Sequence, residues 1–90
     1  MSDDDTASDT RSRIYRLRFD AWERLCAEMG WRSPGAASRA IGVERSTLHR
    51  ILDGSFLPGS SFMAHLMYAV RETGWRHEDL FEIVVRRSAV

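Results

Sequence analysis

Apolar positions recur at spacings of three and four along most of the chain, which is the pattern of amphipathic helices. The first such stretch begins at Ser12 and ends before Gly30, where a glycine favours a left-handed helix cap. Two neighbouring apolar stripes run along it, formed by Ile14, Leu17, Ala21 and Leu25 and by Tyr15, Phe19, Trp22, Cys26 and Met29. The pattern therefore predicts one long first helix from residue 12.

Four shorter helices are predicted after this one. Ser33 and Pro34 suit the cap and the first residue of a helix, since proline lacks the N–H that is not needed there. The expected ranges are residues 34–41, about 44–53, from 60 or 61 to about 73, and about 77–85. We expect an all-α domain over residues 12–85, with a disordered acidic tail at 1–11 and a short C-terminal tail at 86–90.

Length and composition limit the class of protein. A chain of 90 residues with 43% hydrophobic and 29% charged residues is typical of one small globular domain. The acidic N-terminus has no apolar core, so we expect no secretory signal. Cys26 is the single cysteine and cannot form an internal disulfide, which favours a cytoplasmic location.

The net charge of zero hides an uneven distribution. Residues 1–9 carry four Asp and no base, a net charge of −4, and residues 10–90 carry thirteen Arg against nine acids, a net charge of +4. There is no Lys in the chain. A guanidinium suits phosphate groups and guanine edges, but this charge alone is weak support for nucleic-acid binding.

Residues 34–54 carry the pattern of a helix-turn-helix. Ala37 and Ser38 are small where the two helices must cross, and Gly42 permits the sharp turn between them. At 100° per residue, Leu48 and Ile51 of the second helix share the side that faces the core. The outward side then carries Ser46, His49, Arg50 and Asp53, with Arg45 on the rim of the first turn. The two arginines, the histidine and the serine can donate to guanine or phosphate.

The spacing of these residues resembles the phage repressor-like (XRE-type) helix-turn-helix family. The resemblance covers roughly residues 19–84 and is carried by Ser38, Gly42, Val43, Leu48, Ile51, Gly54, Pro58, Leu66, Ala69, Gly74, Trp75 and Leu80. It implies a five-helix lambda-repressor-like bundle that binds double-stranded DNA, with the third helix in the major groove. A repressor that occludes a promoter is the function that the resemblance implies.

The resemblance also assigns the contacting positions. The base-contacting positions of the family fall on Arg45, Ser46, His49 and Arg50. Its phosphate-contacting positions fall on Ser33, Arg39, Thr47 and the loop at Ser55. The family implies a homodimer on two half-sites about 34 Å apart, and apolar Ile83 and Val85, which lie off the stripe of the last helix, are the candidate interface.

The chain departs from the family pattern in three ways. Pro34 stands where a phosphate-gripping Gln is common, and Glu44 stands at a cap position where Ser or Thr is usual. A carboxylate there repels phosphate unless it turns toward Arg45 or a cytosine amino group. The fourth helix is expected to be about one turn longer than usual, with residues 71–73 inserted.

Other interpretations remain open at this level. His49 either reads a base edge or is a solvated helix residue. The N-terminal arginines, Arg11, Arg13, Arg16 and Arg18, form either an arm along DNA or the polar face of the first helix. The whole domain could instead be a protein-interaction module, antitoxin-like or anti-activator, with little DNA binding.

The side chains offer little catalytic chemistry. The histidines His49, His65 and His77 and the thiol of Cys26 have no metal-ligand spacing, and no glycine-rich phosphate loop or nucleophile elbow is present. We expect no enzymatic activity, no metal, no cofactor and no small-molecule ligand. Cys26 and the three tryptophans are expected to be structural.

Overall fold

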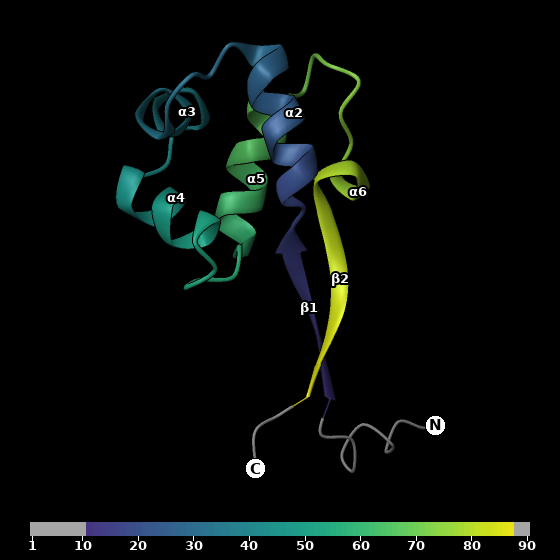
Figure 1. Cartoon of the computed structure of the whole chain (residues 1–90). Helices are drawn as coiled ribbons and strands as arrows, with labels where there is room; N and C mark the ends of the chain where they lie inside the picture. The colour runs from purple at the N-terminus through teal and green to yellow at the C-terminus, as the bar shows by residue number, and fades with distance from the viewer. Residues whose placement is uncertain (1–10, 88–90) are drawn as a thin grey trace.

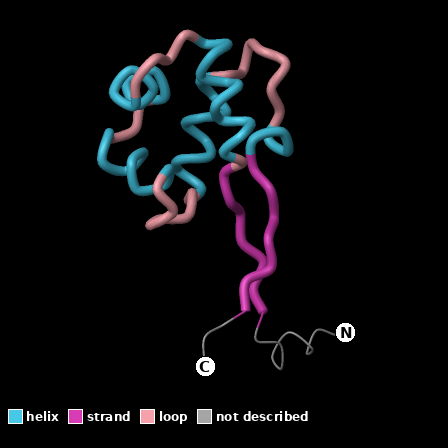
Figure 2. Tube along the Cα trace, viewed as in Figure 1, coloured by secondary structure: helices cyan, strands magenta, loops and turns pink. Residues whose placement is uncertain are grey.

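Helices alternate with turns through the middle of the chain, and a strand lies at each end of the part that the structure describes. This computed structural model describes residues 11–87, and the side chains of residues 13–85 within them. The order of the elements is β1 (Arg11–Leu17), α2 (Phe19–Met29), α3 (Pro34–Ile41), α4 (Arg45–Leu52), α5 (Ser60–Ala69), α6 (His77–Leu80) and β2 (Phe81–Arg87). The helices form one body, and the two strands extend from it as a ribbon (Figures 1 and 2).

The core lies between the helices and the base of the ribbon. Leu25 of α2, Leu48 of α4 and Leu66 of α5 are fully buried, so three separate helices meet at one apolar centre. The rings of Phe62 and Phe81 pack edge to face, with centroids 6.3 Å apart, and join α5 to β2. The core therefore fixes both the helix-turn-helix and the ribbon to the same body.

The predicted helix-turn-helix is present, with α3 and α4 as its two helices. Gly42 has φ +89° and donates its N–H to the carbonyl of Ser38 at 2.8 Å, which ends α3 in a left-handed cap. Ser33 caps the start of α3, where its Oγ accepts the N–H of Ala36 at 3.1 Å. Ala37 and Ser38 of α3 are both buried.

The all-α prediction is wrong, because a two-stranded antiparallel sheet stands where helix was expected at both ends. β1 replaces the first turns of the predicted first helix, and β2 replaces most of the predicted last helix. Residues 83–85 are three consecutive β-branched side chains, which lose rotamer freedom in a helix and pack well in a strand. The antiparallel pairing of β2 with β1 satisfies the facing backbone groups of both strands.

The register of the ribbon separates two faces. One face carries the pairs Leu17–Phe81, Tyr15–Ile83 and Arg13–Val85, and the other carries Ile14–Val84 and Arg16–Glu82. Leu17 and Phe81 are buried at the body, whereas Ile83 and Val85 are 61% and 55% exposed farther out. The ribbon is thus anchored at its base and uncovered beyond it (Figure 2).

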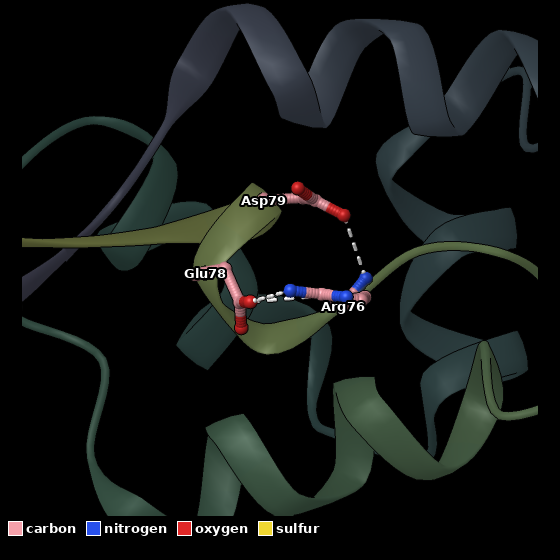
Figure 3. A network of polar contacts seen from close by, with 3 residues as sticks. All are labelled: Arg76, Glu78 and Asp79. Carbon is pink, nitrogen blue, oxygen red and sulfur yellow. Dashed lines mark hydrogen bonds and ion pairs between the residues drawn. The ribbon is translucent and has the colours of Figure 1, made fainter.

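A polar network lies at the start of α6, the short helix that precedes β2 (Figure 3). The carboxylate of Asp79 accepts the backbone N–H of Arg76 at 2.9 Å, which caps this single helical turn. The guanidinium of Arg76 also binds Glu78, with its Nε 3.0 Å from a carboxylate oxygen. This contact lowers the pKa of Glu78 and raises that of Arg76. The helix ends at Leu80, short of the predicted residue 85.

The helix α5 ends at Ala69, so the prediction of a longer helix reaching Thr73 is wrong. The hydroxyl of Thr73 donates to the carbonyl of Val70 at 2.7 Å and accepts the N–H of Trp75 at 3.0 Å. These contacts form a turn, which offers the backbone an alternative to further helix. Residues 71–73 therefore lie in the connection to α6.

The ends of the domain also differ from the prediction. Arg11 begins β1, and Arg86 and Arg87 end β2, although all three were assigned to the tails. The rest of both predicted tails, residues 1–10 and 88–90, lies outside the described residues. None of the helices between residues 11 and 87 has the length and apolar character required to cross a bilayer.

Candidate nucleic-acid interface

The outward side of α4 is open to solvent. Arg45, Ser46, His49 and Arg50, the four predicted base-contacting residues, are all exposed. Together with Pro34 at the start of α3, they line one surface hollow of about 580 Å³. The four side chains therefore lie together on the outward side of α4.

The opposite side of α4 is fixed in the core. Leu48 is fully buried and Ile51 is 3% exposed, while Leu52 lies half-buried on the flank. Burying side chains of this size contributes roughly 1.5–3 kcal/mol each. Because the inward side of α4 is packed in the core, its outward side chains project from a helix that is fixed in place.

Two of the predicted phosphate-contacting residues meet at the start of α3. A Cβ placed on Gly35 would lie 3.5 Å from Nη1 of Arg39 and 3.9 Å from Oγ of Ser33. The side chain of Arg39 therefore lies back along α3 toward Ser33. Both residues are exposed, so a guanidinium and a hydroxyl are available together on this side of the hollow.

The other two predicted phosphate contacts lie on the far flank of α4. Thr47 is half-buried and lines a separate hollow with the loop at Phe56 and Leu57. Ser55 is exposed, and its backbone N–H donates to Oδ1 of Asp53 at 2.8 Å. The predicted phosphate contacts are thus divided between the two flanks of α4.

Two carboxylates adjoin this surface. Glu44 is the N-cap residue of α4, but its exposed side chain forms no capping hydrogen bond. Asp53 accepts from Ser55, and its Oδ2 lies 3.7 Å from Nε2 of His49. The hydrogen bonds from Ser55, followed by the charges of His49 and Arg50, lower the pKa of Asp53. Asp53 is therefore a negative charge with local partners.

Phe56 is a residue of this surface that sequence reasoning did not assign to the site. Its backbone N–H donates to the carbonyl of Arg50 at 3.0 Å, and the guanidinium carbon of Arg50 lies 5.2 Å from its ring centroid. The ring remains 48% exposed. The sequence feature that could have indicated its position is Gly54. With φ +87°, this glycine turns the chain back over the end of α4.

The candidate dimer residues Ile83 and Val85 lie on the ribbon and not on a helix. Tyr15 joins them on the same face, where it is 38% exposed. The predictions for the N-terminal arginines change as well, because Arg13 and Arg16 belong to a strand. Arg16 forms an ion pair with Glu82 at 2.6 Å across the ribbon, so it is neither on a helix face nor in a free arm.

The remaining candidate groups are structural or isolated. Trp22 is buried, and its ring centroid lies 6.0 Å from that of Trp31. Burial, and then the charge of Glu23, raises the pKa of the Cys26 thiol, which disfavours the reactive thiolate. No cluster of three potential metal ligands occurs among the residues that the structure describes.

No family model matches the chain, and neither the curated proteins nor the solved structures include a significant match to it.

Proposed function

We propose that this protein is a sequence-specific DNA-binding transcriptional regulator, a repressor that occludes a promoter by placing α4 in the major groove. The observation that carries the proposal is the hollow on α4, in which Arg45, Ser46, His49 and Arg50 converge while the opposite side of the helix is locked in the core. The major groove is about 12 Å wide and admits one α-helix.

Each side chain has a role that suits its donors and acceptors. Arg45 and Arg50 can donate two hydrogen bonds to O6 and N7 of guanine, and His49 and Ser46 can bond to neighbouring base edges. Ser33 and Arg39 hold phosphates on one side of the groove, and Thr47 and Ser55 hold phosphates on the other. Such phosphate contacts fix the position of the reading helix.

The proposed regulator acts as a homodimer whose subunits meet through the ribbon. An isolated two-stranded ribbon is marginally stable in water, and its outer edges carry unpaired backbone groups. The uncovered face with Tyr15, Ile83 and Val85 gives a second copy an apolar surface to cover. Two copies related by a twofold axis would place two α4 helices on half-sites about 34 Å apart.

The proposed setting is the cytoplasm of a bacterium, with the protein encoded by the host or by a phage. A duplex is directly accessible there, and the single thiol of Cys26 stays reduced. The proposed function needs no metal, cofactor or small-molecule ligand.

A mobility-shift titration on a random duplex at two salt concentrations tests DNA binding itself. Each phosphate neutralised by a cation contributes about −0.9 to the slope of log K against log salt, and Arg39 is the cation among the four proposed phosphate contacts. Arg39→Gln should reduce the slope by about one. Arg24→Gln, an exposed arginine on α2, is the matched control and should leave the slope unchanged.

The competing function is a protein-interaction module, antitoxin-like or anti-activator. The specific observation in its favour is the pair of carboxylates at Glu44 and Asp53, at either end of α4, which oppose phosphate. Such a module would bind the random duplex weakly, and Arg39→Gln and Arg24→Gln would affect the binding equally. That result would replace the DNA-binding proposal.

A further inference from the structure

The loop after α4 folds back onto the helix that it leaves. Gly54 adopts φ +87°, and Ser55 then donates its N–H to Oδ1 of Asp53. One residue later, the N–H of Phe56 donates to the carbonyl of Arg50 at 3.0 Å. These hydrogen bonds fix the backbone of Phe56 beside Arg50.

The ring of Phe56 lies against the charged end of Arg50. The guanidinium carbon is 5.2 Å from the ring centroid, within the range in which the π face attracts a cation. Phe56 is nearly half exposed, so core packing alone does not account for its position. The ring lies where it can support the guanidinium.

No carboxylate within residues 13–85 forms an ion pair with Arg50, although the charge of Arg50 helps to lower the pKa of Asp53. Oδ1 of Asp53 accepts from Ser55, and Oδ2 lies 3.7 Å from Nε2 of His49. The ion pairs within this part of the chain involve other arginines, namely Arg16, Arg24 and Arg76. The ring of Phe56 is thus the side chain found against the guanidinium of Arg50.

We propose that Phe56 is a positioning residue that holds the guanidinium of Arg50 in the orientation that reads one base pair. This inference rests on the proposed function, because it assigns a role within the same DNA-reading surface. A long arginine side chain loses rotamer freedom when it docks on a base. Stacking on Phe56 removes part of that freedom before DNA binds. The base contact of Arg50 then costs less entropy, which increases selectivity at the base pair that Arg50 reads.

The test compares the affinity for a selected operator with the affinity for the same operator changed at one base pair. This base pair is identified beforehand with the Arg50→Ala variant. It is the base pair whose substitution leaves the affinity of that variant for the operator unchanged. Phe56→Ala should lower this affinity ratio about two- to five-fold, the range of an exposed cation–π contact. Phe56→Tyr keeps the π face and should keep the ratio.

Two controls separate positioning from general damage. Leu57→Ala removes a similarly exposed apolar side chain from the same loop and should leave the ratio unchanged. Phe56→Leu keeps apolar volume without a π face, so it should lose selectivity while the thermal midpoint stays near that of the wild type. In the Arg50→Ala background, Phe56→Ala should cause no further loss of selectivity.

The proposal is overturned if Phe56→Ala and Phe56→Leu both keep the ratio, or if they weaken the operator and a random duplex equally. It is also overturned if Phe56→Ala lowers selectivity by the same factor with and without Arg50. A wild-type protein that binds the operator and the random duplex equally would refute the proposed function itself. These two failures are therefore distinguishable.

Discussion

Arg50 is the residue on which selectivity depends most in this account. Arg50→Ala should remove discrimination at one base pair by about 1–3 kcal/mol, because the bidentate contact to guanine is lost. Arg50→Lys is the matched control for charge, since an ammonium keeps attraction to phosphate without the fork geometry. Competition binding with operator and random duplex measures both effects.

A purely electrostatic role for Arg50 would give a different result. Arg50→Ala would then weaken the operator and the random duplex by the same factor, and Arg50→Lys would restore both. That outcome would assign Arg50 to a phosphate and leave selectivity to Arg45, Ser46 and His49.

Asp53 links the end of α4 to its loop in a pH-dependent way. Its pKa is lower in the folded chain than the ordinary value of 3.8, chiefly because Ser55 donates to the carboxylate. A lowered pKa means that the contact stabilises the fold above about pH 3.8 and is lost as the pH falls through the folded value. The carboxylate should therefore contribute at neutral pH and not in strong acid.

The difference in thermal midpoint between wild type and Asp53→Asn measures this contribution. We expect the wild type to have the higher midpoint at pH 7, with the difference narrowing as the pH falls below 3.8. Other carboxylates titrate in both proteins and cancel in the comparison. A difference that stays constant down to strong acid would show that the Asp53 charge is not involved.

The directions of side chains around α4 were predictable, whereas the loop contacts were not. A rotation of 100° per residue separates Leu48 from His49 without knowledge of the rest of the fold. The stacking of Phe56 on Arg50 depends on the path that Gly54 gives to the chain, which no periodicity encodes. The places of Glu44 and Asp53 beside α4 were predictable from the sequence. The hydrogen bond between Asp53 and Ser55 was not, because it depends on the turn at Gly54.

At the scale of elements, Gly42 determines the angle between α3 and α4. Gly42→Ala should destabilise the protein by about 1–2 kcal/mol, because φ +89° disfavours a Cβ. The new Cβ would also lie 3.4 Å from Cδ2 of His65. Urea denaturation measures the loss of stability.

Gly74→Ala is the matched control for this change. A Cβ at Gly74 meets no atom within 4 Å, and its φ lies outside the left-handed region. It should therefore leave the free energy of unfolding almost unchanged. Equal effects of the two substitutions would contradict the role given to the turn.

The ribbon shows where periodicity misleads. Ile14 and Leu17 continue the apolar stripe of α2, so the local pattern favours a helix that begins before Phe19. The pairing of Leu17 with Phe81 joins positions 64 residues apart, and such a contact is invisible to a local window. The β-branched run at 83–85 was the one local signal for a strand.

The ribbon also carries the prediction on oligomeric state. Ile83→Asp should give a monomer with weaker operator binding, because it places a charge on the uncovered apolar face. Sedimentation across a range of concentrations measures the assembly. Tyr68→Asp changes an equally exposed side chain on α5 and should leave the dimer intact. An unchanged profile for Ile83→Asp would remove the ribbon from the interface.

At the scale of the whole molecule, the fold is more elongated than a compact chain with the same number of residues. Its extents are 46 × 26 × 21 Å, and its radius of gyration of 15.1 Å exceeds the roughly 12 Å typical of a compact chain of this length. The ribbon extends away from the helical body (Figure 1). The proposed reading of DNA by α4 and the proposed assembly through the ribbon would therefore use separate surfaces.

Selection of bound duplexes from a random pool shows directly whether α4 reads DNA. We expect enrichment of an inverted repeat whose half-sites lie about 10 base pairs apart from centre to centre. One position of each half-site should lose its preference when Arg50→Ala is used for the selection. A pool that remains as random after several rounds as at the start would contradict the claim that α4 reads DNA.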